Sequence, residues 1–180
     1  MRRAVFLDRD GVINRAIVRN GKPYPPASLE EMEILPGVAD ALNALRGAGY
    51  LLVVVTNQPD VTRGTQKREV VEAMHSYLMA NLPVDEIKTC YGTSSETSDC
   101  YKPRPGMLLE AAKTHNINLA RSFTVGDRWR DIGAGQAAGT FTIFIDYGYQ
   151  EERPQNPDAT VASLADAAAI ILSECPEGKV

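Results

Sequence analysis

Two carboxylates directly follow a short apolar run near the start of the chain. Residues 2 to 16 read RRAVFLDRDGVINRA, in which residues 4 to 7 lead straight into Asp8 and Asp10. Two like charges at the end of a buried strand repel each other, so the arrangement is unfavourable unless a cation or a reacting group lies between them. The pair therefore predicts a site that holds a cation, a reacting group, or both.

Polar residues also follow other apolar runs. Thr56 and Asn57 end the run YLLVVVTN, Asp127 ends SFTVGD with Asp131 four residues later, and Lys102 precedes a helical pattern. Ligands of open parallel sheets bind beyond the carboxyl ends of the strands, so we expect these side chains to share one crevice. Several carboxylates without a nearby histidine suit Mg²⁺, and the lysine suits a transferring phosphoryl group.

The elements that must position these residues alternate along the chain. Short runs rich in Val, Ile, Phe and Thr predict strands at 4–8, 50–56, 86–91, 122–127 and 140–146. Apolar periodicity with Pro and Gly boundaries predicts helices near 37–48, 65–81, 105–116, 129–138 and 162–174. Buried strands separated by helices predict a doubly wound, mostly parallel, Rossmann-like α/β sheet with helices on both faces.

One segment, at about 12–35, does not fit this alternation. It carries the turn signal Asn20-Gly21 followed by three prolines, and we expect a hairpin or flap that covers the paired acids. Residues 150–159 are expected to form a polar loop before the last helix. With 180 residues and no interdomain linker, the whole chain is predicted to be one domain.

Composition limits the partners and the location. A net charge of -4 and a pI near 5.2 argue against a nucleic-acid surface. No apolar run is long enough to span a membrane and no signal peptide is recognised, so we expect a cytoplasmic protein with no membrane partner. A monomer is a separate expectation. The three cysteines, Cys90, Cys100 and Cys175, imply no disulfide framework and agree with a reducing compartment.

Four motifs resemble those of a known family. DRDGVI, TNQ, KPRPGM and GDRWRDI, in this order, are similar to the motifs of the haloacid dehalogenase superfamily of phosphohydrolases. The longer stretches FLDRDGVIN, VVTNQPDVTRG and KPRPGML resemble the branch of D-glycero-D-manno-heptose 1,7-bisphosphate phosphatases and histidinol-phosphate phosphatases. The resemblance implies a capless haloacid dehalogenase-like fold and a Mg²⁺-dependent sugar-phosphate phosphatase.

The implied reaction is removal of the C7 phosphate of a heptose 1,7-bisphosphate, which leaves the 1-phosphate. Histidinol phosphate or another small phosphomonoester is the enzymatic alternative. The non-enzymatic alternative is a catalytically silent protein that binds a phosphosugar. The sequence mark of a silent protein would be loss of Asp8, Asp10 or Asp127, and all three are present.

The resemblance also implies roles for individual residues. Asp8 would be the nucleophile that forms an aspartyl-phosphate, and Asp10 the general acid that later activates water. Mg²⁺ would be held by Asp8, the backbone carbonyl of Asp10 and Asp127. Thr56, Asn57 and Lys102 would stabilise the phosphoryl oxygens, while the residues expected to bind substrate or support the site are Gln58, Arg63, Tyr101, Arg128 and Asp131. Read without the resemblance, Arg63 is a solvated charge and Asp131 a residue that favours a helix N-terminus.

The sequence departs from the branch in two places. Many members carry a zinc loop with three cysteines and a histidine, but here Gly92 and Ser98 stand where two of those ligands are expected, beside Cys90 and Cys100. Two thiolates do not complete a tetrahedral zinc site, so we expect no zinc and a loop held by packing or left mobile. Tyr101 replaces the arginine that would recognise the distal phosphate, so the phosphoryl-transfer residues are kept while a specificity residue is changed.

Overall fold

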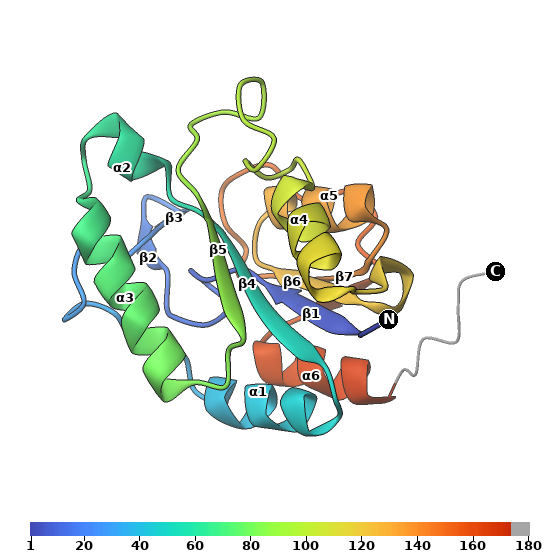
Figure 1. Cartoon of the computed structure of the whole chain (residues 1–180). Coiled ribbons are helices and arrows are strands. Elements are labelled where there is room, and N and C mark those ends of the chain that lie inside the picture. The colour runs from blue at the N-terminus through green and yellow to red at the C-terminus, as the bar shows by residue number, and fades with distance from the viewer. Residues whose placement is uncertain (174–180) are drawn as a thin grey trace.

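A six-stranded parallel sheet forms the centre of the computed structural model, which describes residues 1–173 (Figure 1). The strand order is β5-β4-β1-β6-β7-β8, and every neighbouring pair is parallel. The strands are β1 (Ala4–Leu7), β4 (Leu51–Asn57), β5 (Glu86–Cys90), β6 (Phe123–Gly126), β7 (Phe141–Ile145) and β8 (Ala159–Val161). The predicted fold class is confirmed.

Helices cover both faces because the strands are apolar on both sides. Val5 and Leu7 of β1 pack with α1 (Val38–Gly47) and α6 (Leu164–Ser173), which lie below the sheet in Figure 1. Ala4 and Phe6, which point the opposite way, pack with α4 (Gly106–His115) and α5 (Trp129–Ala138) above it. This double burial explains the continuous apolar runs in the sequence.

The segment between β1 and α1 contains the predicted hairpin. Its strands β2 (Ile17–Arg19) and β3 (Lys22–Tyr24) are antiparallel. Asn20 and Gly21 have φ values of 50° and 73°, as a tight hairpin turn requires. The backbone N–H of Gln150 donates a 2.8 Å hydrogen bond to the carbonyl of Gly21, which ties the hairpin tip to the loop after β7.

Three short elements differ from the sequence-based expectation. Helix α2 (Pro59–Arg63) precedes α3 (Arg68–Asn81), and a 3₁₀ turn covers Leu119–Arg121. Strand β8 begins at the end of the region expected to be a polar loop. Elements of three to five residues are too short to produce a period, so only contacts with neighbouring elements define them. Residue 174 of the last predicted helix and Cys175 lie outside the described residues.

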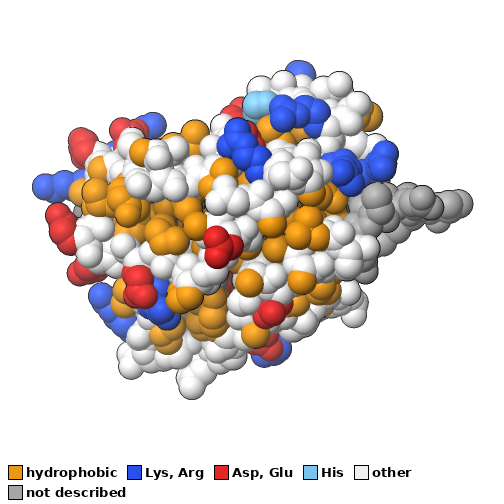
Figure 2. Space-filling view, turned by 90° about the horizontal axis from the view of Figure 1, so that it is seen from below, with side chains coloured by type: hydrophobic (Ala, Val, Ile, Leu, Met, Phe, Trp, Pro, Cys, Tyr) orange, Lys and Arg blue, Asp and Glu red, His pale blue; other side chains and the backbone are white. Residues whose placement is uncertain are grey.

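The surface below the sheet is mixed in character. Figure 2 shows this face with apolar side chains in patches between acidic, basic and uncharged groups. Among residues 1–173, no helix has both the length and the apolar composition needed to cross a membrane.

Candidate active site

A pocket of about 340 Å³ opens at the carboxyl ends of β1 and β4 and gathers most of the predicted site residues. Its lining includes Asp8, Asp10, Thr56, Asn57, Gln58, Arg63, Tyr101, Lys102, Arg128 and Asp131. Asp127 does not line this pocket, but it is buried beside Asp8 and Asp131. Because the strands are parallel, their carboxyl ends lie at one edge of the sheet, and residues of all four sequence motifs meet there.

Lys102 lies between two carboxylates at the floor of this pocket. Its Nζ donates to Asp8 Oδ1 at 2.8 Å, to Asp131 Oδ1 at 2.6 Å and to the carbonyl of Val55 at 2.8 Å. Burial opposes the charged form, but the charges of Asp131 and Asp8 outweigh it and raise the pKa of Lys102 above its ordinary value. The ammonium group stays protonated and offsets part of the carboxylate repulsion.

Asp8, Asp127 and Asp131 form a buried carboxylate cluster. One oxygen from each lies within 4.8 Å of the others. Burial and the charge of Asp131 raise the pKa of Asp8 to about 6, and burial with the charge of Asp8 raises the pKa of Asp127 well above its usual value. Within the described part of the chain, Asp127 Oδ1 is buried and has no hydrogen-bond partner. An unpartnered buried oxygen among hard carboxylate donors fits a Mg²⁺ site.

Gly11 allows the loop after β1 to pass against this cluster. Its φ is 89°, and a Cβ at this position would lie 1.9 Å from Asp127 Oδ2. A larger residue would therefore displace the Asp127 carboxylate and strain the backbone.

Asp10 accepts hydrogen bonds from three side chains, whereas Asp8 lies within a cluster of carboxylates. Arg9 donates to both of its carboxylate oxygens at 2.9 to 3.1 Å, and Asn14 and Gln58 donate one hydrogen bond each. Burial would raise the pKa of Asp10, but the charge of Arg9 and these hydrogen bonds lower it. Two carboxylates two residues apart thus have pKa values shifted in opposite directions.

Arg9 and His75 extend the network around Asp10 in a way that the sequence patterns did not reveal. Arg9 is fully buried, and its Nη1 donates to Nε2 of His75 at 3.1 Å. Burial and the Arg9 charge lower the pKa of His75 to about 4, so the imidazole is neutral and accepts this hydrogen bond. His75 lies 66 positions after Arg9, and no local sequence pattern reports a contact over that separation.

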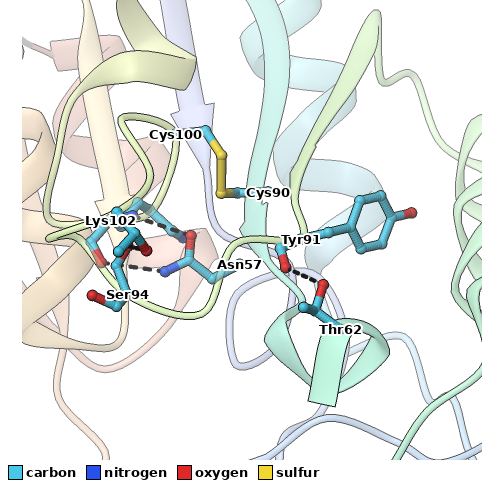
Figure 3. The surroundings of a disulfide bond; sticks show 8 residues. Asn57, Thr62, Cys90, Tyr91, Ser94, Cys100 and Lys102 are labelled. Atoms are coloured by element: carbon cyan, nitrogen blue, oxygen red, sulfur yellow. Dashed lines mark hydrogen bonds between the residues drawn. A yellow bond between two sulfur atoms is a disulfide. The ribbon is translucent and has the colours of Figure 1, made fainter. Parts of the chain in front are cut away.

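The last two residues of β4 and the residue after it connect the site to Lys102. Gln58 Nε2 donates to Thr56 Oγ1 at 2.9 Å as well as to Asp10. Asn57 Nδ2 donates to the carbonyl of Lys102 at 3.3 Å, and the Lys102 N–H donates to Asn57 Oδ1 at 3.1 Å (Figure 3). Both ends of this amide thus fix the Lys102 backbone, and the predicted contact of Asn57 with phosphoryl oxygens stays a prediction.

Two tyrosines after β7 contact the carboxylate cluster and the loop that passes against it. Tyr149 donates to Asp127 Oδ2 at 2.8 Å and Tyr147 donates to the Gly11 carbonyl at 2.8 Å, with their rings stacked at 5.5 Å. Ligands also bind beyond the end of a strand such as β7, so the stretch DYGYQ at 146–150 carries a sequence signal for these two tyrosines.

Arg63 and Arg128 reach the pocket already paired. Arg63 is half-exposed and bonds Asp60 at 3.3 Å. Arg128 bonds Glu151 through two nitrogens, and its backbone N–H donates to Asp131 Oδ2 at 3.0 Å. Tyr101 is buried in the core near α4 and forms an uncharged part of the pocket wall.

The loop between β5 and Lys102 corrects one expectation. Cys90 and Cys100 form a disulfide with Cα atoms 5.5 Å apart, so this loop is neither free nor held by packing alone (Figure 3). A Cβ on Gly92 would lie 2.2 Å from Ser98 Oγ and 3.4 Å from Cys90 Sγ, so the four positions that correspond to the zinc loop of the branch still lie together. The pairing of these two cysteines removes the thiol-based argument for a reducing compartment. The expectation of no zinc stays a prediction.

Comparisons with known proteins agree with this geometry. Residues 99–167 match a family model described as HAD-hydrolase-like. A D-glycero-beta-D-manno-heptose-1,7-bisphosphate 7-phosphatase of Rhodopseudomonas palustris is 36% identical over 77% of this chain and 80% of its own length. The enzyme of the same name from Pasteurella multocida is 34% identical over 95% and 97%.

A solved structure is also similar. The D,D-heptose 1,7-bisphosphate phosphatase from B. bronchiseptica, complexed with magnesium and phosphate, superposes with a TM-score of 0.76 at 27% identity. The match covers 95% of this chain and 98% of that protein.

Lys102→Met should destabilise the fold more at pH 8 than at pH 5. Removing one partner of a buried ion pair leaves uncompensated charge and costs about 3 to 5 kcal/mol. Below a pKa of about 6, Asp8 takes up a proton and part of this repulsion disappears. Urea unfolding in EDTA measures the difference, with the exposed Lys113→Met as the control. An equal loss of stability at both pH values would contradict the electrostatic account.

Reduction of the Cys90–Cys100 bond should lower the free energy of unfolding. Closing a loop with a sequence separation of 10 constrains the unfolded chain by about 2 to 3 kcal/mol. Urea unfolding with and without dithiothreitol checks this, and the double variant Cys90→Ser/Cys100→Ser should not respond to the reductant. A wild-type protein whose stability ignores dithiothreitol has no such bond in solution.

Proposed function

The chain belongs to the HAD-like phosphatase family, and we propose that it removes the C7 phosphate of a heptose 1,7-bisphosphate through an aspartyl-phosphate on Asp8. The observation that carries this proposal is the arrangement around Asp8. Its Oδ1 accepts from Lys102 while a pocket of about 340 Å³ opens over the carboxylate. A phosphoryl group in that pocket meets a nucleophile and a fixed cation together.

Asp10 is the proposed acid and base. Its carboxylate is held in place by Arg9, Asn14 and Gln58, so it faces the pocket in one orientation. The lowered pKa favours the ionised form, which suits activation of water in the second step. In the first step the negative charge of the arriving phosphoryl group raises the pKa of Asp10, which lets it bring a proton to the leaving oxygen.

Mg²⁺ is the proposed metal. Asp8 and Asp127 would hold it through their carboxylates, with the backbone carbonyl of Asp10. Asp131, whose oxygens accept from Lys102 and from the Arg128 N–H, would support the site from behind. A bound cation would neutralise charge on the phosphoryl oxygens. Thr56, oriented by Gln58, would add a hydrogen bond to the same oxygens.

The substrate proposal rests on the relatives, which are named for the β anomer of heptose 1,7-bisphosphate. Histidinol phosphate remains the second substrate to test. We propose further that the chain acts as one domain, as a cytoplasmic monomer without structural zinc, on a small-molecule substrate.

Purified protein with Mg²⁺ should release phosphate from heptose 1,7-bisphosphate with a higher kcat/KM than from histidinol phosphate or common sugar monophosphates. Asp8→Asn should reduce kcat more than about 10³-fold, because it removes the nucleophile. Circular dichroism and urea unfolding report whether the variant folds. A folded Asp8→Asn variant that keeps activity within tenfold of wild type would exclude the covalent mechanism.

The apparent Mg²⁺ affinity should fall as the pH drops through about 6. Metal ligands must be deprotonated, and the pKa of Asp8, raised to about 6, makes protons compete with the ion. Calorimetric titration of Mg²⁺ should show at least a roughly tenfold weaker affinity per pH unit below that value. An affinity that is constant from pH 7 to pH 5 would mean that Asp8 is not a ligand.

A further inference from the structure

The rim of the pocket carries more positive charge than the reacting phosphate needs. Beside Lys102 at the floor, four basic residues line the same pocket. Lys22 comes from the hairpin, Arg63 from α2, and Arg128 and Arg130 from the start of α5.

These four residues divide into two groups. Arg63 is paired with Asp60, and Arg128 is paired with Glu151. Lys22 and Arg130 form no ion pair within residues 1–173. They are therefore the two rim cations whose charge no carboxylate of the described chain offsets.

The backbone at Lys22 and the side chain of Arg130 are each restrained by neighbouring groups. Lys22 is the first residue of β3, and the hairpin tip next to it is fixed by the hydrogen bond from Gln150 to Gly21. The guanidinium of Arg130 stacks over the ring of Trp129 at 4.8 Å, which restricts its rotamers. A site assembled in advance loses less free energy on binding than one that must be ordered.

We propose that Lys22 and Arg130 bind the phosphate of the bisphosphate that is not hydrolysed. This inference rests on the proposed function and names the residues that select for its substrate. A bisphosphate that places one phosphate between Asp8 and Lys102 must place the other farther out in the same pocket. A phosphate of charge near -2 is best held there by cations that have no carboxylate partner. Tyr101, the uncharged wall, supplies none.

The test compares heptose 1,7-bisphosphate with the matching heptose 7-phosphate, which lacks the second phosphate. In Lys22→Gln and in Arg130→Gln, the ratio of the two kcat/KM values should fall about tenfold each, because each variant loses one charge-assisted contact. Lys22→Arg and Arg130→Lys keep the charge and should retain most of the ratio. Lys67→Gln and Arg121→Gln, which remove exposed charges outside the pocket, are the matched controls.

Binding gives a second measurement that does not depend on turnover. In an Asp8→Asn background, calorimetry should show that Lys22→Gln/Arg130→Gln weakens binding of the bisphosphate by tenfold or more beyond its effect on the 7-phosphate. Equal effects on both ligands, or none on either, would overturn the inference while leaving the phosphatase proposal intact. A wild type that hydrolyses neither ligand contradicts the proposed substrate, and the binding ratio still decides the role of Lys22 and Arg130.

Discussion

The ammonium group of Lys102, bonded to Asp8 and Asp131, is the interaction on which the site depends. Three buried carboxylates within 4.8 Å would repel one another strongly without a cation. Lys102 compensates two of them and leaves Asp127 with an unpartnered oxygen. The cluster therefore keeps an excess of negative charge, which a divalent cation would balance. A cation bound there would in turn attract the oxygens of a phosphoryl group.

Much of the surrounding chain serves to place this lysine. The amide of Asn57 bonds both backbone groups of Lys102, and the Cys90–Cys100 disulfide closes the loop that precedes it. On the other side, Gly11 lets the loop after β1 approach Asp127. The sheet, the loop and the disulfide thus hold Lys102 and Asp127 in place before a substrate binds. Binding then costs less conformational entropy in these side chains.

The sequence predicted the parallel sheet and the gathering of most motif residues in one pocket, because apolar runs and the polar residues that end them are local signals. It could not reveal contacts between distant positions. His75 on α3 supports Arg9, and the hairpin residue Lys22 reaches the pocket wall, only because the chain folds back. The disulfide escaped prediction because an odd number of cysteines fixes no pairing, and β8 because three residues carry no period.

A single turnover quenched in acid tests the central claim most directly. Protein mixed with heptose 1,7-bisphosphate and Mg²⁺, then digested and analysed by mass spectrometry, should carry a phosphoryl group on the peptide that contains Asp8. Asp8→Asn should carry none. Hydrolysis at the normal rate with no phosphoryl group on Asp8 at any quench time, or with the group on another side chain, would contradict the account.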